Sequence, residues 1–419
     1  MQLTSSTDAL DTSQHRWPSI RSATDQPAVV GLIALLAWLG FVLARWQVWA
    51  RGNISRFVLL GTTFTNRRHL PSGMVIGDPN AKGYDGQFYY RLAVNPFNWH
   101  RTAYGITMDQ KYRYTRIGYP ILAWLGSFGQ HEWVPVLLVA INLVCVAVLA
   151  MLGAMFARDA GRHALWGLVF VAFFGLVISV GRDTAEPLAE ACMLGGLLAY
   201  RHGRWVLSAA AFGYGGITRE TILLAPAAIA VLRLPSLVCH LVHRRGRPAR
   251  ADLAWLVPGL AFGAVQLAGR FALRGGHWPV VTDWDRNLTT PFTAMVDALR
   301  QAGARVDTGH LGLYDITLLE SVTLGILVVA GLAVLFVTTA PAHERLAFVV
   351  AVMMVCALSS QIWGSVFGDG RSMIEPYLFA LILLVATPKR YLNAYSLGLV
   401  TAGLVPALYV VARRRILYM

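Results

Sequence analysis

Charged residues are scarce in this chain. Asp, Glu, Lys and Arg together make up 14% of the 419 residues, 56% are hydrophobic, and the mean hydropathy is +0.52. An ordinary soluble domain carries roughly 25% charged residues, so the shortage of charge excludes that class. The composition predicts an all-α polytopic membrane protein.

Lysine is almost absent. The 36 basic residues include only Lys82, Lys111 and Lys389, which leaves 33 arginines (36 − 3) and a net charge of +14. This bias indicates a GC-rich genome in the first place. A second interpretation is phosphate recognition, because the guanidinium group is permanently charged and binds phosphate through two parallel hydrogen bonds.

Cysteine is also rare, with only four residues in the chain. They are Cys145, Cys192, Cys239 and Cys356, each in or beside an apolar segment. Their spacing does not match that of metal ligands or of a disulfide framework. We therefore expect them to be core residues.

Apolar segments of the length that crosses a membrane recur along the chain. A spanning helix needs about 20 apolar residues, and we predict about eleven such helices, within roughly 10 to 12 because sequence places boundaries only to within a few residues. The predicted segments are Val29–Ala50, Trp133–Ala157, Ala164–Gly181, Thr184–Tyr200, Trp205–Ile217, Thr221–Leu234, Leu253–Leu273, Val322–Thr339, Leu346–Phe367, Met373–Ala386 and Ala394–Val411. They form one predicted transmembrane domain over residues 29–412, between an N-terminal tail (1–28) and a C-terminal tail (413–419).

The distribution of arginine predicts the orientation of these segments. Cytoplasmic loops carry an excess of Lys and Arg, and the most basic short loop lies within residues 235–252. The short basic loops fall on the same, cytoplasmic side as the N-terminal tail if residues 205–234 form a hairpin that turns at Thr218–Glu220. The three arginines at 413–415 then fall outside, so either the last segment is re-entrant or the helix count is wrong by one.

Two long loops, residues 51–117 and 274–319, face the outside in this topology, and we expect them to carry short interfacial helices. The first contains ten Lys and Arg residues against three Asp and no Glu. This charge suits docking on anionic headgroups, and it suits a pocket for an anionic substrate equally well. Because both loops are too short for an independent domain of ordinary size, we expect the chemistry where they meet the helix ends.

The segment Gly83–Ala93 of the first outer loop places Asp85 between two glycines, ahead of three consecutive aromatic residues. Phe88 and Leu92 are four residues apart, as on one face of a short helix in the membrane interface. Asp85 is a preferred type of helix cap, or it is a general base that takes a proton from a hydroxyl group. The flanking glycines and the aromatic cluster favour the general base.

Charged residues also lie at two predicted outer turns further along the chain. Arg182 and Glu186 are spaced as a local ion pair on a helix, or they line a cavity, as ionisable groups in apolar segments usually do. Arg219 and Glu220 form either a local ion pair or a site in which Arg219 contacts phosphate.

A third outer turn contains Arg371, at the start of a predicted helix. Free backbone N–H groups at a helix start make a good anion site, and a plain surface loop is the alternative. These three turns fall on the same predicted side as Asp85. That convergence predicts one site.

Five short segments combine into a pattern. They are Tyr84–Ala93 (aromatic-Asp-Gly-x-aromatic-aromatic), Arg113–Leu122 with its Tyr119-Pro120 pair, Thr184–Leu188, Tyr200–Trp205 followed by Gly216–Arg219, and Gly370-Arg371 ahead of Pro376. Their order and spacing resemble the multipass GT-C glycosyltransferases, particularly the bacterial relatives of the PIG-V type mannosyltransferases. Many members have a pair of acids in the first loop, whereas this chain has Asp85 alone, with Asp78 as the candidate second acid.

The resemblance implies a GT-C-like fold in a bacterial cytoplasmic membrane and an inverting sugar transfer at the outer face. The implied partners are a polyprenyl-phosphate sugar donor, a hydroxyl acceptor on a glycan, lipid or protein, and membrane lipids, with no nucleic acid. Asp85 is the implied base, and Arg219, Arg371 and Arg182 are implied to stabilise the departing phosphate. We expect no metal, because a lipid monophosphate leaving group has no obvious need of one. The predicted substrate-binding residues are Tyr84, Gln87, Tyr90, Arg91, Arg182, Glu186, Arg219, Glu220 and Arg371.

A different class stays open, namely a transporter or lipid flippase for an anionic or lipid-linked substrate. Transporters favour sites near the bilayer midplane on broken helices in repeated halves. This sequence shows no internal repeat, and its ionisable residues gather at one predicted face. An acyltransferase is less favoured, because the eleven histidines lie mostly in loops and at helix ends.

Overall fold

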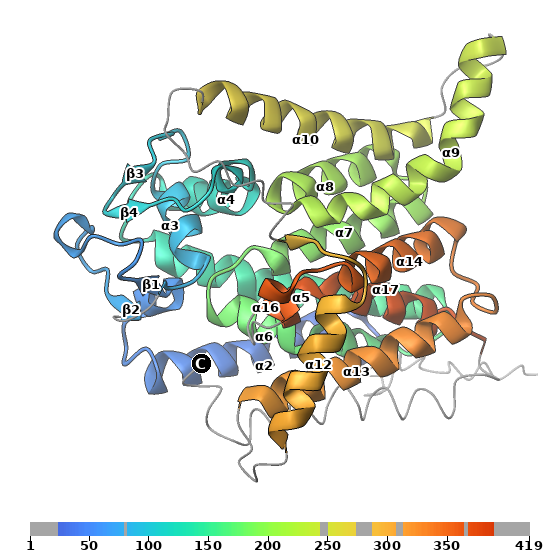
Figure 1. Ribbon diagram of the computed structural model, residues 1–419. Helices are drawn as coiled ribbons and strands as arrows, with labels where there is room; N and C mark the ends of the chain where they lie inside the picture. Colours follow the sequence, from blue (N-terminus) through green and yellow to red (C-terminus); the bar gives the residue numbers. More distant parts are fainter. Residues whose placement is uncertain are drawn as a thin grey trace, which may run out of the picture.

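The computed structural model describes residues 24–78, 82–243, 250–273, 287–306, 313–363 and 368–388. These residues are mostly helical, and the strands among them are short. The long helices lie alongside one another, and the strands gather at one end of the assembly (Figure 1). The predicted helical fold is confirmed in this coarse form.

Among the described residues, four helical segments are long and apolar enough to cross a membrane. The first is α2 (Pro27–Val48) and the second is α5 (Val134–Asp159). The third and fourth segments, Glu220–Cys239 and Arg250–Ala272, contain most of α9 (Leu224–His243) and all of α10 (Leu253–Ala272). Large apolar side chains such as Leu36 on α2 and Leu260 on α10 are exposed. Exposed apolar surface of this kind marks contact with something other than water, which here fits a lipid bilayer.

A fifth span exists only if a broken element is counted as one. The predicted segment Ala164–Gly181 is divided into a 3₁₀-helix, η4 (Ala164–Val171), and α6 (Phe174–Gly181), which meet at 62°. The described residues therefore contain four spans, or up to five, and do not confirm about eleven. The predicted span Ala394–Val411 and the tail that follows lie outside the described residues.

Most of the other predicted spans are shorter helices. They are α7 (Glu186–Arg201), α8 (Trp205–Thr218), α14 (Ala342–Cys356), α15 (Ser360–Trp363) and α17 (Ile374–Val385), and a further short helix, α16 (Gly368–Ser372), lies between two predicted spans. The longest of these, α7, has 16 residues, or about 24 Å at 1.5 Å per residue, which is less than the ~30 Å hydrocarbon core. All residues of α17 are buried inside the protein. An apolar run of this length does not distinguish a buried core helix from a span, so the predicted number exceeds the number of helices that are long enough to span among the described residues.

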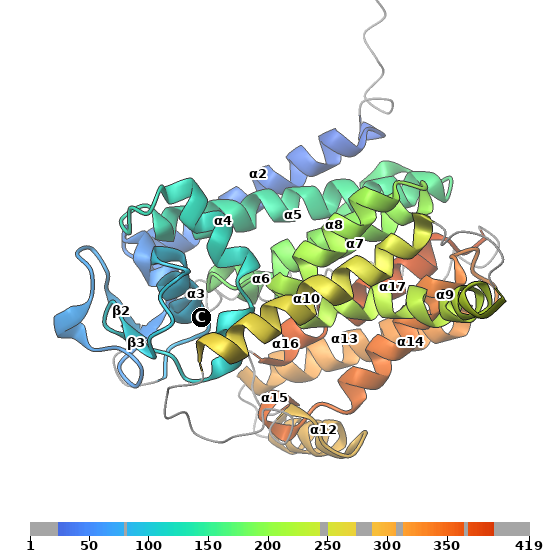
Figure 2. The same cartoon turned by 90° about the horizontal axis from the view of Figure 1, so that it is seen from above.

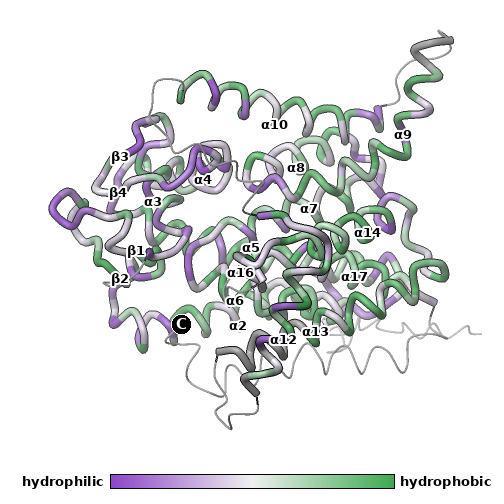
Figure 3. The backbone as a smooth tube through the Cα atoms, in the orientation of Figure 1, coloured by the Kyte–Doolittle hydropathy of each residue, from purple (hydrophilic) through white to green (hydrophobic). Residues whose placement is uncertain are grey.

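The helices pack in a layered bundle. α2 lies along α5, α7 packs against both α5 and α8, and α10 crosses over α8 (Figure 2). α17 is enclosed by α14 and by α13 (Leu313–Val334). Hydrophobic residues dominate these helices, whereas the strand end of the bundle is more hydrophilic (Figure 3).

The chain reverses direction at Arg219, as the predicted hairpin requires. α8 ends at Thr218, and the short helix η5 (Glu220–Leu223) folds back onto it. A Cβ atom added at Gly215 would lie 2.8 Å from Ile222 Cγ2. Residues seven apart in a continuous helix would be roughly 10 Å apart along its axis, so this contact requires a turn.

At the end of the bundle opposite to this turn, polar contacts join the ends of neighbouring helices. Arg201, at the end of α7, donates from Nε to Glu344 Oε1 at 2.6 Å, at the start of α14. His202 Nε2 lies 3.1 Å from Asp159 Oδ2, at the end of α5. Helix α7 therefore runs from the Arg219 end of the bundle, where Glu186 lies, to this second end.

The predicted first outer loop folds as a small subdomain. Its elements are η1 (Ile54–Val58), β1 (Leu60–Gly61), η2 (Arg67–His69), β2 (Ile76–Asp78), α3 (Gly86–Val94), β3 (Thr102–Ala103), β4 (Ile106–Thr107) and η3 (Lys111–Thr115), followed by α4 (Gly118–Ser127). β1 and β2 pair in parallel, and β3 and β4 pair antiparallel. The expectation that the Phe88–Leu92 helix lies in the interface is wrong, because every residue of α3 is buried, packed against α4, α5 and η1.

Two other loop boundaries also differ from the prediction. The basic loop predicted from residue 235 begins later, because α9 continues through Pro235 to His243. The second outer loop, predicted over 274–319, contains α12 (Thr293–Val306) and the first turns of α13. Residues 244–249 and 274–286 lie outside the described part of the chain.

Candidate functional site

Two glycines place Asp85 at a tight corner between the loop subdomain and the bundle. Gly83 has φ +68°, and a Cβ atom there would lie 2.4 Å from Gly61 N. A Cβ atom at Gly86 would lie 2.4 Å from the carbonyl oxygen of Arg182. Real Cβ contacts are never so short, so both positions require glycine. The glycine pattern thus has a packing cause, and it brings Asp85 against the turn before α7.

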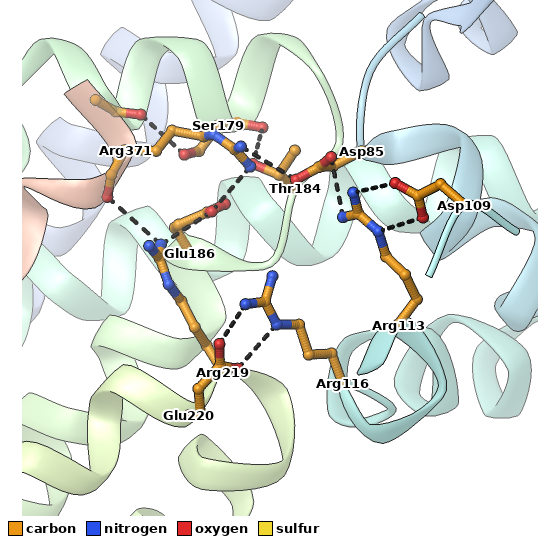
Figure 4. Close-up of polar contacts among 11 residues, drawn as sticks. Asp85, Asp109, Arg113, Arg116, Ser179, Thr184, Glu186, Arg219, Glu220 and Arg371 are labelled. Atoms are coloured by element: carbon orange, nitrogen blue, oxygen red, sulfur yellow. Dashed lines mark hydrogen bonds and ion pairs between the residues drawn. The ribbon is translucent and has the colours of Figure 1, made fainter. Parts of the chain in front are cut away.

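The side chain of Asp85 does not cap α3. Its carboxylate makes no capping hydrogen bond and lies between two arginines instead (Figure 4). Arg113 Nη1 is 2.9 Å from Oδ1, and Arg371 Nη2 is 3.1 Å from Oδ2. The capping alternative is therefore wrong.

Each of these arginines has a second carboxylate partner. Arg113 donates from Nε and Nη2 to the two oxygens of Asp109, both at 2.9 Å. Arg371 Nη1 donates to Glu186 Oε1 at 3.0 Å, and Arg219 Nη1 lies 2.9 Å from the same oxygen. We call this row of alternating charges the charge chain; it comprises Asp109, Arg113, Asp85, Arg371, Glu186 and Arg219.

Further ion pairs surround the Arg219 end of the charge chain. Arg116 donates from Nε to Glu220 Oε2 at 2.8 Å, with a second hydrogen bond from Nη2 to Oε1. Arg219 Nε is 3.6 Å from Oε1 of Glu375, which also accepts a hydrogen bond from Thr221. The predicted local pair of Arg219 and Glu220 is thus replaced by pairs with Arg116, which directly follows η3, and with residues of α7 and α17.

Tyr84 supports the charge chain through its ring. The guanidinium groups of Arg182 and Arg371 lie over this ring, with Cζ 4.4 and 4.6 Å from its centroid. An aromatic face attracts cations in this arrangement. Burial raises the pKa of the Tyr84 hydroxyl, so the ring stays neutral. Tyr84 therefore helps to hold two arginines without adding a charge.

Three predicted substrate-binding residues lie inside the loop subdomain, apart from the charge chain. Gln87 is buried, accepts a hydrogen bond from Gly61 N at 3.3 Å and donates to Lys82 O at 2.9 Å. Arg91 is buried, donates to the carbonyl of His100, and lies over the ring of Tyr114. Tyr90 is buried, and its hydroxyl has no hydrogen-bond partner among the described residues.

Sequence reasoning missed four residues of the site, namely Asp109, Arg113, Arg116 and Glu375. Asp109 and Arg113 are four residues apart, which is the spacing of a local ion pair. That signal was present in the sequence. Arg116 and Glu375 left no comparable signal, because their partners are 104 and 154 residues away in the chain.

The arginines dominate the electrostatics at Asp85. Burial alone raises the pKa of this carboxyl group, but Arg113 and then Arg371 outweigh burial and hold the pKa well below its ordinary value. A carboxylate with a low pKa is a weak proton acceptor. Asp85 is therefore ionised but restrained as a base while both arginines contact it.

The carboxylates of the site pair with arginines rather than with one another. Within the described residues, no group of three or more His, Cys, Asp or Glu side chains is placed to hold a metal ion.

Searches against protein families, curated proteins and solved structures gave no match. The fold and site define a helical protein with several helices apolar and long enough to cross a membrane, and with a buried arginine–carboxylate chain at one end of its bundle.

Proposed function

We propose that the protein is a GT-C-type glycosyltransferase that moves a sugar from a polyprenyl-phosphate donor to a hydroxyl acceptor, with inversion. The observation that carries this proposal is the convergence of Asp85 with Arg371 and Arg219, from three separate segments, into one charge chain. A potential base thereby lies beside permanent cations, and a phosphate-leaving reaction needs both.

The chemistry assigns a different task to each end of the charge chain. Asp85 accepts the proton of the acceptor hydroxyl as its oxygen attacks the anomeric carbon. The bond between that carbon and the phosphate oxygen breaks, and the lipid phosphate leaves with the additional negative charge. Arg371 and Arg219 stabilise that charge, because preorganised cations in a water-poor site stabilise a developing anion strongly.

Stability alone is a weak explanation for such a cluster. Taking several charges out of water costs free energy that their attraction only partly recovers, and apolar residues of similar volume are often as stable or more so. Perturbed ionisable groups gather at functional sites. The buried charge chain therefore supports catalysis or ligand binding more than it supports a structural role.

The proposed location is the outer face of a bacterial cytoplasmic membrane. The end of the bundle opposite to the charge chain carries Arg162, Arg201, Arg204 and Arg345, in or beside its helix ends. Cytoplasmic ends of membrane helices are enriched in such residues. This distribution supports an orientation in which Asp85 faces outward.

A transporter or flippase is the second candidate, and two observations favour it. Glu190 is buried in α7, and both of its carboxyl oxygens have no hydrogen-bond partner among the described residues. Ionisable groups of this kind occur in proton relays of transporters. The break between η4 and α6 also resembles the discontinuous helices of transporter sites.

One experiment separates the two candidates. Membranes containing the protein are incubated with a panel of radiolabelled polyprenyl-phosphate sugars, and the label is followed into acceptor material. Transfer that depends on Asp85 supports the glycosyltransferase. Movement of labelled lipid across reconstituted vesicles, with no glycosidic bond formed, supports the transporter.

A further inference from the structure

Arg371 shares its guanidinium group between two carboxylates. Nη1 donates to Glu186 Oε1 at 3.0 Å, and Nη2 donates to Asp85 Oδ2 at 3.1 Å. Its Nε has no hydrogen-bond partner among the described residues. The two Nη atoms thus face two separate anionic oxygens, which is the donor arrangement that a phosphate group also accepts.

The three arginines of the charge chain are not held equally. Arg113 has a bidentate contact with Asp109 that does not involve Asp85. Arg219 lies near both Glu186 and Glu375. Arg371 belongs to a helix of five residues, and its side-chain hydrogen bonds go to the two carboxylates that it shares. Arg371 is therefore the arginine that can exchange a partner while the others keep theirs.

The contact between Arg371 and Asp85 works against the proposed reaction. Nη2 of Arg371 donates to Asp85 Oδ2 at 3.1 Å and Nη1 donates to Glu186 Oε1 at 3.0 Å, so both terminal nitrogens already face carboxylates. A phosphate that binds this guanidinium group through two hydrogen bonds must take the place of a carboxylate. Release of Asp85 leaves its carboxylate beside one cation fewer, which makes it a better proton acceptor.

We propose that Asp85 and Glu186 occupy the phosphate site of Arg371, and that a lipid phosphate displaces Asp85 from it. This inference rests on the proposed function and adds the order of events. Phosphate binds Arg371, Asp85 loses one of its two arginines, and the carboxylate becomes able to accept the hydroxyl proton.

The test measures binding of a phosphate ligand without any sugar. Farnesyl phosphate, a short polyprenyl monophosphate, is titrated into the purified full-length protein in detergent. Asp85→Asn removes the competing charge from Arg371, so we expect about three- to tenfold tighter binding, the size that one exchanged ion pair of modest strength gives. Arg371→Ala should lose most of the binding.

Asp159→Asn is the matched control. It also removes one carboxylate charge, but Asp159 lies at the opposite end of the bundle, where it contacts His202. We expect its affinity to stay within about twofold of the wild-type protein, which is the usual effect of a residue away from the site. An equal gain in both variants would show only a general charge effect, and an unchanged or weaker affinity in Asp85→Asn would overturn the exchange.

A second variant keeps the test decisive if Asp85→Asn is unfolded. Glu186→Gln removes the other competitor of Arg371 and should also tighten binding, and unaltered affinity there would overturn the exchange as well. The outcome is separable from the proposed function. Sugar transfer without tighter binding leaves the glycosyltransferase standing and rejects the exchange. Tighter binding without sugar transfer from any donor supports the exchange and rejects the glycosyltransferase.

Discussion

Arg371 lies 3.1 Å from Asp85, although 286 residues separate them in the chain. Helix α16 brings the arginine to the corner that Gly83 and Gly86 make for the aspartate. The sequence around either residue does not by itself place the other one beside it. The contact exists only in the folded bundle.

Asp85→Asn should abolish sugar transfer while the protein still inserts and folds. The amide has nearly the same shape but accepts no proton, so we expect a loss of about 100-fold or more, the range of general-base catalysis. Initial rates with a saturating donor measure the effect. Asp159→Asn, at the opposite end of the bundle, is the control and should retain the wild-type rate. Wild-type turnover in Asp85→Asn would show that Asp85 is not the general base.

Arg371→Lys should impair donor use almost as much as Arg371→Ala. A lysine ammonium is a point charge and cannot reproduce the planar fork that reaches two anionic groups. We expect kcat/KM for the donor to fall about tenfold or more, as for loss of a donor to a developing anion. Arg204→Ala removes an exposed arginine at the other end and should change nothing. Full activity of Arg371→Lys would show that only the positive charge of Arg371 matters and that its planar guanidinium geometry does not.

Part of this site could be predicted from the sequence. In a chain with so little charge, Asp85, Arg182, Glu186, Arg219 and Arg371 stand out, because ionisable groups beside apolar segments are costly and usually functional. The structure brings them together at one end of the bundle. The long-range partners were harder to predict, since a pair such as Arg116 and Glu220, 104 residues apart, leaves no periodic signal.

The helix count and the depth of α3 show the limit of hydropathy. A run of apolar residues reports exclusion from water but not whether lipid or protein covers it. α17 is apolar because it is enclosed by α13 and α14. α3 looked amphipathic, yet Arg91 and Gln87 on it are buried, and each donates a hydrogen bond to a backbone carbonyl. Tertiary contacts decided both cases.

Gly86→Ala should destabilise the protein and disturb the site. The added Cβ would approach the carbonyl oxygen of Arg182 to 2.4 Å, and backbone on both sides must shift. Overpacking of this kind costs about 1–3 kcal/mol, so we expect a lower thermal midpoint and slower transfer. Gly40→Ala, in α2, meets nothing within 4 Å and should be neutral or stabilising. Equal thermal midpoints for Gly86→Ala and the wild type would show that the backbone around Gly86 can make room for the added Cβ atom.

The pH dependence of the rate should differ between kcat/KM and kcat. The acidic limb of kcat/KM reports the free protein, in which Arg113 and Arg371 hold the pKa of Asp85 below its ordinary value of about 3.8. The acidic limb of kcat reports the complex, in which phosphate has taken Arg371. With one cation fewer beside it, Asp85 binds a proton more readily, so its pKa rises. As the pH falls, kcat should therefore decline first, at a higher pH than kcat/KM. The two profiles, measured in Asp109→Asn as well as in the wild type, should keep this order. Coinciding acidic limbs would mean that Asp85 keeps both arginines throughout the reaction.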